Sequence, residues 1–206
     1  QYQNKKIETS NNIKINKFYS QNQSNYKLKN EPFVGFIGSG NYASKVLIPS
    51  FAKAGCNFHS LISPNGNLSS YLGKKFLFPI VGTDSEIIFN DENCNAVVIS
   101  TRHDTHCELF LKALDHGKNI FLEKPLCINF EQLKLIERKY EEFISKNNNY
   151  PVIMIGFNRR FSPLIKDIKH YICKSNAPKS FIYTINAGKV DKDNWIQDPC
   201  IGGGRL

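Results

Sequence analysis

The sequence predicts an α/β fold, in which a doubly wound parallel Rossmann sheet is followed by the start of an α+β domain with a mostly antiparallel sheet. From residue 32 onward, short apolar runs alternate with helical patterns, as in a βαβ architecture. A glycine-rich turn directly follows the first apolar run. After the last helical pattern, residues 179–188 alternate between polar and apolar side chains, which is typical of an antiparallel strand with one wet face.

Three segments follow from these patterns. Residues 1–31 are expected to be a linker or the tail of an upstream domain, with at most one strand over residues 13–19. Residues 32–158 are expected to form the dinucleotide-binding Rossmann domain. Residues 159–206 are expected to begin an α+β domain, and the family resemblance described below implies that this domain is incomplete and serves substrate binding and oligomerisation. The 206 residues, 41% of them hydrophobic, can bury the core of one domain and part of another.

The elements can be placed by their boundaries. Strands are predicted over residues 32–38, 57–63, 95–100, 119–123 and 151–158, with a short one inside 76–82. Helices are predicted over residues 41–55, kinked at Pro49, and over 105–116, 129–143 and 162–174. Two capping boxes, Thr105 to Glu108 and Asn129 to Gln132, are expected to open the second and third of these helices.

The net charge of +9 does not by itself predict nucleic-acid binding. Residues 1–30 hold six lysines and one glutamate, so they carry more than half of the excess, whereas residues 31–206 carry only +4. A solvated segment explains this distribution better than a basic face on the folded part. A basic arm for an acidic partner remains the alternative for residues 1–30.

The turn GFIGSGNYA contains Gly38-x-Gly40-x-x-Ala43 between a predicted strand and a predicted helix. Gly38 allows the tight turn, Gly40 lets a pyrophosphate approach the backbone, and Ala43 lets helix and strand pack closely. The phosphates would lie at the helix N-terminus, on the backbone of this turn, including Ser39, Asn41 and Tyr42. The alternative is a glycine-rich turn without a ligand.

The second strand ends without the residue that usually identifies the dinucleotide. An acidic residue at this position binds the ribose hydroxyls of NAD, and an arginine nearby accommodates the 2′-phosphate of NADP. Here Ser63 occupies the position and neither residue type is present. The cofactor is therefore NAD or NADP, with a small preference for NADP, and Ser63, Asn65 or Lys74 are the candidates for holding a 2′-phosphate.

The cysteines indicate the compartment. All six lack a C-x-x-C partner, which favours free thiols in a reducing, cytoplasmic setting over disulfides. His103, His106 and Cys107 could be mistaken for metal ligands, but no carboxylate or further cysteine completes a set, so no metal is expected. No apolar run approaches a membrane span, and the N-terminus is not a signal peptide, so we expect no membrane partner.

Lys124 follows a predicted strand and precedes a proline. Pro125 disfavours a helical backbone at Lys124 and so restricts where the lysine side chain points. Such a restriction is expected for a lysine with a functional role at the carboxyl end of a strand. The alternative is a solvated surface charge.

Several motifs together resemble one family. They are the glycine turn, STRHDTH (100–106), EKP (123–125), IGFNRRFSP (155–163), NAG (186–188) and WIQDPCIGGGR (195–205). Residues 33–206 resemble the glucose-fructose oxidoreductase/inositol dehydrogenase/MocA family, and in particular the C-terminal module of bi-domain oxidoreductases with an upstream alcohol-dehydrogenase-like domain. The resemblance implies an NAD(P)-dependent oxidoreductase that transfers hydride between nicotinamide and a hydroxyl carbon of a sugar, nucleotide-sugar or cyclitol, and that forms homo-oligomers.

The resemblance also implies residue roles. Lys124 would be the catalytic residue beside the substrate hydroxyl, positioned by Glu123 and Pro125. The further implied cofactor contacts are Thr101, Arg102, His106, Glu123, Lys124, Pro125 and Asn158. The further implied substrate contacts are Arg159, Trp195 and Arg205, although Trp195 could equally be a core aromatic.

Two expectations concern the whole protein. The resemblance implies a catalytic histidine beyond Leu206, so the sequence is expected to be C-terminally truncated, with unpaired strand edges that favour aggregation. A non-catalytic dinucleotide-binding regulator on the same fold is the alternative function, because fold alone does not determine activity.

Overall fold

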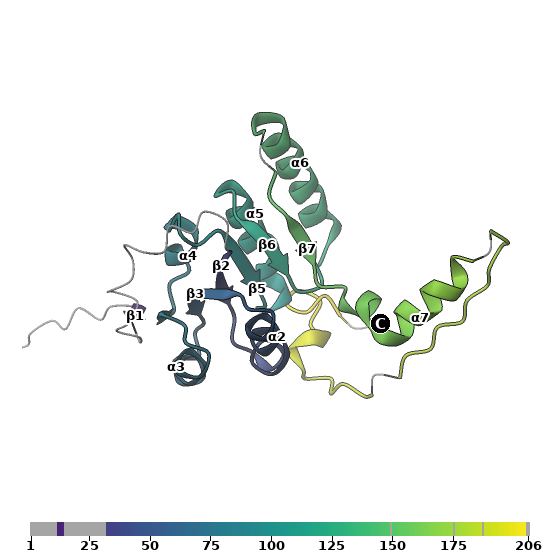
Figure 1. The fold of residues 1–206 in the computed structure, drawn as a ribbon, viewed down its shortest axis with the longest axis horizontal. Helices are drawn as coiled ribbons and strands as arrows, with labels where there is room; N and C mark the ends of the chain where they lie inside the picture. The colour runs from purple at the N-terminus through teal and green to yellow at the C-terminus, as the bar shows by residue number, and fades with distance from the viewer. Residues whose placement is uncertain (1–11, 15–31, 149, 175, 187, 205–206) are drawn as a thin grey trace, which may run out of the picture.

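A seven-stranded sheet organises the part of the chain that the computed structural model describes, which is residues 12–14, 32–148, 150–174, 176–186 and 188–204 (Figure 1). The strand order is β1-β4-β3-β2-β5-β6-β7. All neighbours are parallel except β1, which pairs antiparallel with β4 at one edge. The strands are β1 (Asn12–Lys14), β2 (Phe33–Ile37), β3 (Asn57–Ile62), β4 (Ile80–Gly82), β5 (Ala96–Ile99), β6 (Asn119–Leu122) and β7 (Ile153–Ile155).

Helices cover both faces of the sheet, as a doubly wound fold requires. In Figure 1, α2 and α3 lie below the strands, and α4, α5 and α6 lie above them. The helical elements are η1 (Ala43–Leu47), α2 (Ile48–Lys53), α3 (Gly66–Lys75), α4 (Glu86–Asn90), η2 (His103–Thr105), α5 (His106–Asp115), α6 (Phe130–Lys146), η3 (Asn158–Phe161), α7 (Pro163–Ile172) and η4 (Trp195–Gln197). The predicted α/β fold with a doubly wound parallel sheet is therefore confirmed.

Each face has its own apolar core. Under α2 and α3, a group of phenylalanine rings packs mostly edge to face. Phe36 lies at its centre, and its ring centroid is 5.3 Å from that of Phe51 and 5.8 Å from that of Phe78. On the opposite face, the strands present Ile, Val and Leu to α4, α5 and α6. Phe36 and Ile37 are both buried although they point to opposite faces, so the continuous apolar runs of the sequence reflect burial on two sides.

The helix after the glycine turn contains a π turn immediately before Pro49. The amide of Ile48 donates to the carbonyl of Ala43, five residues earlier. Pro49 has no amide hydrogen to donate, and the π turn accommodates this missing bond within a continuous helical path. The kink expected at Pro49 thus takes the form of a widened turn.

Three local predictions differ from the structure. Helices α3 and α4 are not among the predicted elements. The Thr105 capping box is wrong, because η2 precedes α5 and the Thr105 hydroxyl donates backwards to the carbonyl of Arg102 at 2.8 Å. The strand expected over residues 179–188 is not formed in the described residues 179–186 and 188, which are exposed and have no neighbouring strand to pair with.

The second capping box is partly confirmed. The side chain of Asn129 accepts from the amide of Gln132 at 2.9 Å, but Gln132 accepts from Ile128 instead of from Asn129. Of the residues expected to form a linker, only 12–14 are described, and they form β1. No helix in the described ranges is long and apolar enough to cross a membrane.

Candidate functional site

The candidate site is a cleft of about 1610 Å³ at the carboxyl edge of the parallel strands. It lies where the strand order changes direction: the chain winds from β2 to β3 and β4, and then crosses to β5 on the other side of β2. Ligands of open α/β sheets bind at such switch points. The cleft is lined by four groups of residues, namely 38–43 with Ser63 and Pro64, 100–106 with Glu108 and Leu109, Glu123 and Lys124, and 156–160 with Trp195.

Backbone hydrogen bonds fix where each loop of the cleft begins. The first amide after a strand donates to the last carbonyl of a neighbouring strand, at 2.7–2.9 Å in all five cases. The pairs are Gly38–Ile62, Ser63–Gly82, Ser100–Ile37, Glu123–Ile99 and Gly156–Leu122. The residues that begin the loops are therefore held at the sheet edge by main-chain bonds, and the Ser100 hydroxyl adds contacts of 3.3 Å to the carbonyls of Ile37 and Gly38.

The glycine turn has the geometry that a dinucleotide requires. Gly38 has φ of 105°, and a Cβ there would lie 2.4 Å from the backbone oxygen of Ser100. Gly40 is exposed, and a Cβ at this position would meet no atom within 4 Å, so its backbone is open to the cleft. The following helix begins at Asn41, which directs the amides of its first turn toward this space. These residues fit a bound pyrophosphate.

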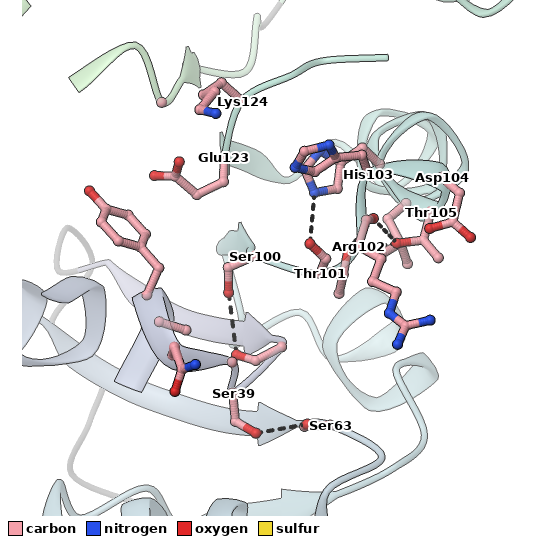
Figure 2. A pocket seen from close by; sticks show the side chains of 18 of the residues that line it. Ser39, Ser63, Ser100, Thr101, Arg102, His103, Asp104, Thr105, Glu123 and Lys124 are labelled. Carbon is pink, nitrogen blue, oxygen red and sulfur yellow. Dashed lines mark hydrogen bonds between the residues drawn. The ribbon is translucent and has the colours of Figure 1, made fainter. Parts of the chain in front are cut away.

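Three buried serine hydroxyls form a chain on the β3 side of the cleft, and Figure 2 shows the first two, Ser39 and Ser63. Ser39 donates to Ser63 at 2.8 Å, and Ser69 lies 3.2 Å from Ser39 and donates to the carbonyl of Asn65 at 2.7 Å. Ser63 occupies the position where an NAD-binding site usually has an acid. The site therefore presents neutral hydroxyls where a ribose would lie.

Two residues considered for a 2′-phosphate are placed differently from Ser63. The Asn65 side chain caps α3 by accepting from the amide of Leu68 at 3.2 Å. Lys74 lies in the last turn of the same helix, about 13 Å from Asn65 along the axis at 1.5 Å per residue. Lys74 does not line the cleft.

The loop after β5 forms the middle of the cleft. Figure 2 shows Ser100 and Thr101 between the serine pair on one side and Glu123 with Lys124 on the other. The hydroxyls of Thr101 and Thr105 are 2.6 Å apart, and Arg102 is exposed at the cleft. Thr101 and Arg102 thus both line the cleft, and their contact with a dinucleotide stays a prediction.

His106 lines the cleft but is fully buried. Its Nδ1 lies 2.6 Å from the carbonyl oxygen of Pro125, and its Nε2 lies 3.3 Å from that of Thr101. Burial lowers the pKa of its imidazole, against an opposing effect of these carbonyls. The ring joins two loops of the chain instead of presenting a free nitrogen to a ligand.

Glu123 and Asn158 form a polar chain that reaches the glycine-turn helix. The Asn158 amide donates to the Glu123 carboxylate at 2.9 Å and to the Tyr42 hydroxyl at 3.2 Å. Burial raises the pKa of the Glu123 carboxyl, and the Asn158 bond opposes this effect. A Cβ at Gly156 would lie 2.7 Å from the Glu123 carboxylate, so glycine leaves room for this arrangement.

Lys124 is exposed at the cleft, and its ammonium makes no hydrogen bond within the described residues. The Lys124–Pro125 peptide bond is cis. Pro125 is the one described member of the predicted cofactor set that does not line the cleft. Arg159 lines it, whereas Arg205 lies outside the described residues.

The segment around η4 returns to the loop after β5. The Trp195 ring meets the His103 ring edge to face, with centroids 4.9 Å apart, and the Arg102 guanidinium lies 5.8 Å from the indole centroid. His103 Nδ1 lies 2.7 Å from the carbonyl of Gly202, a contact that no sequence pattern predicts. The Trp195 ring therefore lines the cleft and is only partly buried.

Sequence reasoning missed three residues of the cleft region. The sequence excludes His103 as a metal ligand and assigns it no other role, although it supports the returning segment through Gly202 and Trp195. The sequence analysis assigns no individual role to Gly156 or Ser69. Gly156 directly follows a strand, as Gly38 does, and this position was the available signal. Ser69 gave none, because its partner Ser39 is 30 residues away.

No group of three or more His, Cys, Asp or Glu side chains in the described part of the chain could hold a metal ion. All six cysteines are free, and burial raises the pKa of the Cys94 thiol to about 12.

A parallel doubly wound sheet with a glycine turn at its switch point defines a dinucleotide-binding Rossmann protein. The chain belongs to the GFO_IDH_MocA family, described as "Oxidoreductase family, NAD-binding Rossmann fold", whose model matches residues 33–143. The family resemblance seen in the sequence is thus confirmed.

Two curated relatives illustrate the similarity. The scyllo-inositol 2-dehydrogenase (NAD(+)) of Bacillus subtilis is 33% identical over 96 residues, which are 47% of this chain and 26% of that protein. Oxidoreductase P35 of Formosa agariphila is 25% identical over 179 residues, which are 82% of this chain and 54% of that protein. The matched part of the chain spans about half or less of the length of these relatives.

Solved structures share the fold. A point mutant of the 3-ketoreductase KijD10 of Actinomadura kijaniata, in complex with TDP-benzene and NADP, has a TM-score of 0.66 at 17% identity, over 85% of this chain and 53% of that one. A scyllo-inositol dehydrogenase of Lactobacillus casei with bound NAD(H) and scyllo-inositol has a TM-score of 0.63 at 19% identity, over 70% of this chain and 42% of that one.

Proposed function

We propose that this chain is the dinucleotide-binding part of an oxidoreductase that transfers hydride between nicotinamide and a hydroxyl-bearing carbon of a sugar, nucleotide-sugar or cyclitol. One observation carries the proposal: a glycine turn suited to pyrophosphate and an exposed lysine line the same cleft, at the ends of β2 and β6. Relatives named as inositol and levoglucosan dehydrogenases support the substrate class.

Each residue group has a distinct task in this proposal. Gly38 and Gly40 give the pyrophosphate access to the backbone, and the serine chain of Ser39 and Ser63 faces the adenosine ribose. When bound, the nicotinamide supplies the hydride donor or acceptor. Glu123, whose carboxylate accepts from Asn158, fixes the backbone directly before Lys124 at the side of the cleft.

In this proposal, Lys124 accepts or donates the proton of the substrate hydroxyl. In the oxidation direction, Nζ of Lys124 would accept the hydroxyl proton in its neutral amine form, while the substrate C–H bond breaks and its hydride leaves to the dinucleotide. In the reduction direction, Nζ returns the proton to the carbonyl oxygen as it gains negative charge. Arg159 and Trp195 line the same cleft and would contact the substrate, together with Arg205.

The preference for one dinucleotide follows from the uncharged Ser63 at the end of β3, where the adenosine ribose would bind. Without an acid at Ser63, a 2′-phosphate meets no fixed negative charge there, so NADP is accepted at least as well as NAD. The free cysteines support a reducing compartment such as the cytoplasm. We also propose the boundaries 32–158 for the dinucleotide domain and 159–206 for the start of the substrate domain, with homo-oligomers and a fused upstream domain in the complete protein.

The experiment is a titration of NADH and NADPH, followed by nicotinamide fluorescence and by quenching of Trp195, the single tryptophan. Saturable micromolar binding supports the proposal. A folded chain that binds neither dinucleotide contradicts it. Binding without turnover of inositols or sugars by the protein that carries this sequence would favour the second candidate, a dinucleotide-binding regulator.

A further inference from the structure

The imidazole of His106 is the polar group most completely enclosed at the cleft. It has no exposed surface, and it sits in the first turn of α5, between the ends of β5 and β6. A buried polar group without hydrogen bonds is costly, so the partners of such a ring show what it does. Both partners here are backbone carbonyls, one in each of two different loops.

The two bonds differ in length and in consequence. The contact from Nδ1 to the Pro125 carbonyl is 2.6 Å, and the contact from Nε2 to the Thr101 carbonyl is 3.3 Å. Since carbonyls only accept, the shorter contact assigns the ring proton to Nδ1, which donates to Pro125. Pro125 directly follows Lys124, so this bond holds the main chain on the far side of the lysine.

The main chain directly before Lys124 is fixed by hydrogen bonds of Glu123. The Glu123 amide donates to Ile99 in β5, and the Glu123 carboxylate accepts from Asn158. The sheet thus fixes the residue before Lys124. Proline lacks an amide hydrogen, so Pro125 offers only its carbonyl as a backbone hydrogen-bonding group.

We propose that His106 is a positioning residue for Lys124, because its bond to the Pro125 carbonyl fixes the turn from which the lysine reaches into the cleft. This inference rests on the proposed function of Lys124. It replaces the expectation that His106 contacts the cofactor, since the ring is fully buried and its Nδ1 proton is donated to the chain itself.

Three substitutions separate this role from a packing role. The side-chain nitrogen of His106→Asn can take the place of Nδ1 and keep the bond to Pro125. That of His106→Gln reaches the place of Nε2, beside Thr101. His106→Phe keeps a ring but makes neither bond. His116→Asn is the matched control, because His116 is an exposed histidine at the other end of the same helix.

The test combines three measurements on each variant: the dissociation constant for NADPH, the turnover number, and the titration of Lys124. The last is followed by NMR of ¹³C-dimethylated lysines, with the Lys124 signal assigned from Lys124→Arg. We expect His106→Asn and His116→Asn to stay within about threefold of the parent. We expect His106→Gln and His106→Phe to lose about tenfold or more in turnover and to shift the Lys124 titration, with NADPH binding nearly unchanged.

Three results would overturn the inference. The first is an unchanged Lys124 titration in folded His106→Phe. The second is an equal loss in the Asn and Gln variants, which would make the Pro125 bond irrelevant; this comparison decides the matter if the Phe variant does not fold. The third is a parallel loss of NADPH binding in all three His106 variants, which would restore a cofactor contact. Because the Lys124 titration needs no turnover, a failed oxidoreductase assay does not affect it.

Discussion

The two edges of the sheet carry the same kinds of residue and use them differently. The amino edge has a lysine, a histidine and an acid in Lys118, His59 and Asp91. Lys118 donates to the carbonyls of Asp91 and Cys94 at 2.8 and 2.7 Å, and His59 lies 2.9 Å from the Asp91 carboxylate. Lys118 and His59 are buried, and the chain itself occupies their polar atoms.

The carboxyl edge instead leaves a lysine free. Lys124 is exposed to a cleft and makes no hydrogen bond within the described residues, while the neighbouring Glu123 and His106 hold the chain around it. The comparison teaches that residue type does not distinguish a structural group from a chemical one. What distinguishes them is whether the polar atoms are already satisfied by the protein.

The largest expected effect concerns Lys124. Lys124→Met should lower turnover by about 10²- to 10⁴-fold, because the proton then has no acceptor beside the substrate oxygen. The free energy of unfolding should change by less than about 0.5 kcal/mol, since Lys124 supports no other group. Steady-state kinetics and urea denaturation measure the two quantities, with Lys134→Met, at an exposed position of α6, as the control. Undiminished turnover would remove Lys124 from the mechanism.

The opposite result is expected at the amino edge. Lys118→Met should lower the free energy of unfolding by about 2–4 kcal/mol, because two backbone carbonyls lose their buried donor. Dinucleotide affinity of the folded variant should be unchanged, since Lys118 is at the far edge from the cleft. Urea denaturation tests the loss against Lys134→Met. If Lys118→Met were as stable as the parent, the amino-edge network would not be structural.

A smaller effect is expected for cofactor preference. Ser63→Asp should shift the ratio of NADPH to NADH affinity about tenfold or more toward NADH, because a carboxylate accepts from ribose hydroxyls and repels a 2′-phosphate. Ser63→Asn has a similar size without the charge and is the control. Fluorescence titrations give both dissociation constants. An equal ratio in the Asp and Asn variants would show that charge at Ser63 does not set the preference.

The smallest effect compares the two buried histidines through pH. Burial lowers the pKa of both His59 and His106 below the ordinary 6.5. Both therefore bind a proton less readily in the folded chain than when unfolded. Their contribution to stability is therefore present above pH 6.5 and is lost as the pH falls toward their folded pKa values, by at most about 1.4 kcal/mol per pH unit for each.

Replacing either histidine should flatten this slope. His59→Gln and His106→Asn should each remove about half of the loss between pH 6.5 and 5.5, as measured by urea denaturation across that range. His116→Asn should leave the slope unchanged, since His116 is exposed. An unaltered slope in His59→Gln would show that His59 does not exchange a proton on unfolding in this range.

The features predicted from sequence depend on neighbours along the chain. The apolar runs, the glycine turn and the Asn129 cap are all local signals, and the structure contains them. Helix α3 was missed because it is polar and contains Gly66 and Gly73, which weaken a helical pattern.

The cleft was only partly predictable for a related reason. The glycine turn and EKP could be read as motifs, but the Ser39–Ser63 bond, the Tyr42–Asn158–Glu123 chain and the His103–Trp195 contact join residues 24 to 116 positions apart. No local pattern encodes such pairs, since they arise only when the strands are laid in order.

The main-chain bonds at the carboxyl edge have a consequence for how such a site can change. Because amides and carbonyls hold Ser63, Ser100 and Glu123 in place, these main-chain bonds remain when the side chains are exchanged. Gly38 is the exception, because a Cβ there would lie 2.4 Å from the backbone oxygen of Ser100, whereas a Cβ at Gly156 would meet only the end of the Glu123 side chain. The side chains at this edge can therefore change one loop at a time, provided that Gly38 is kept.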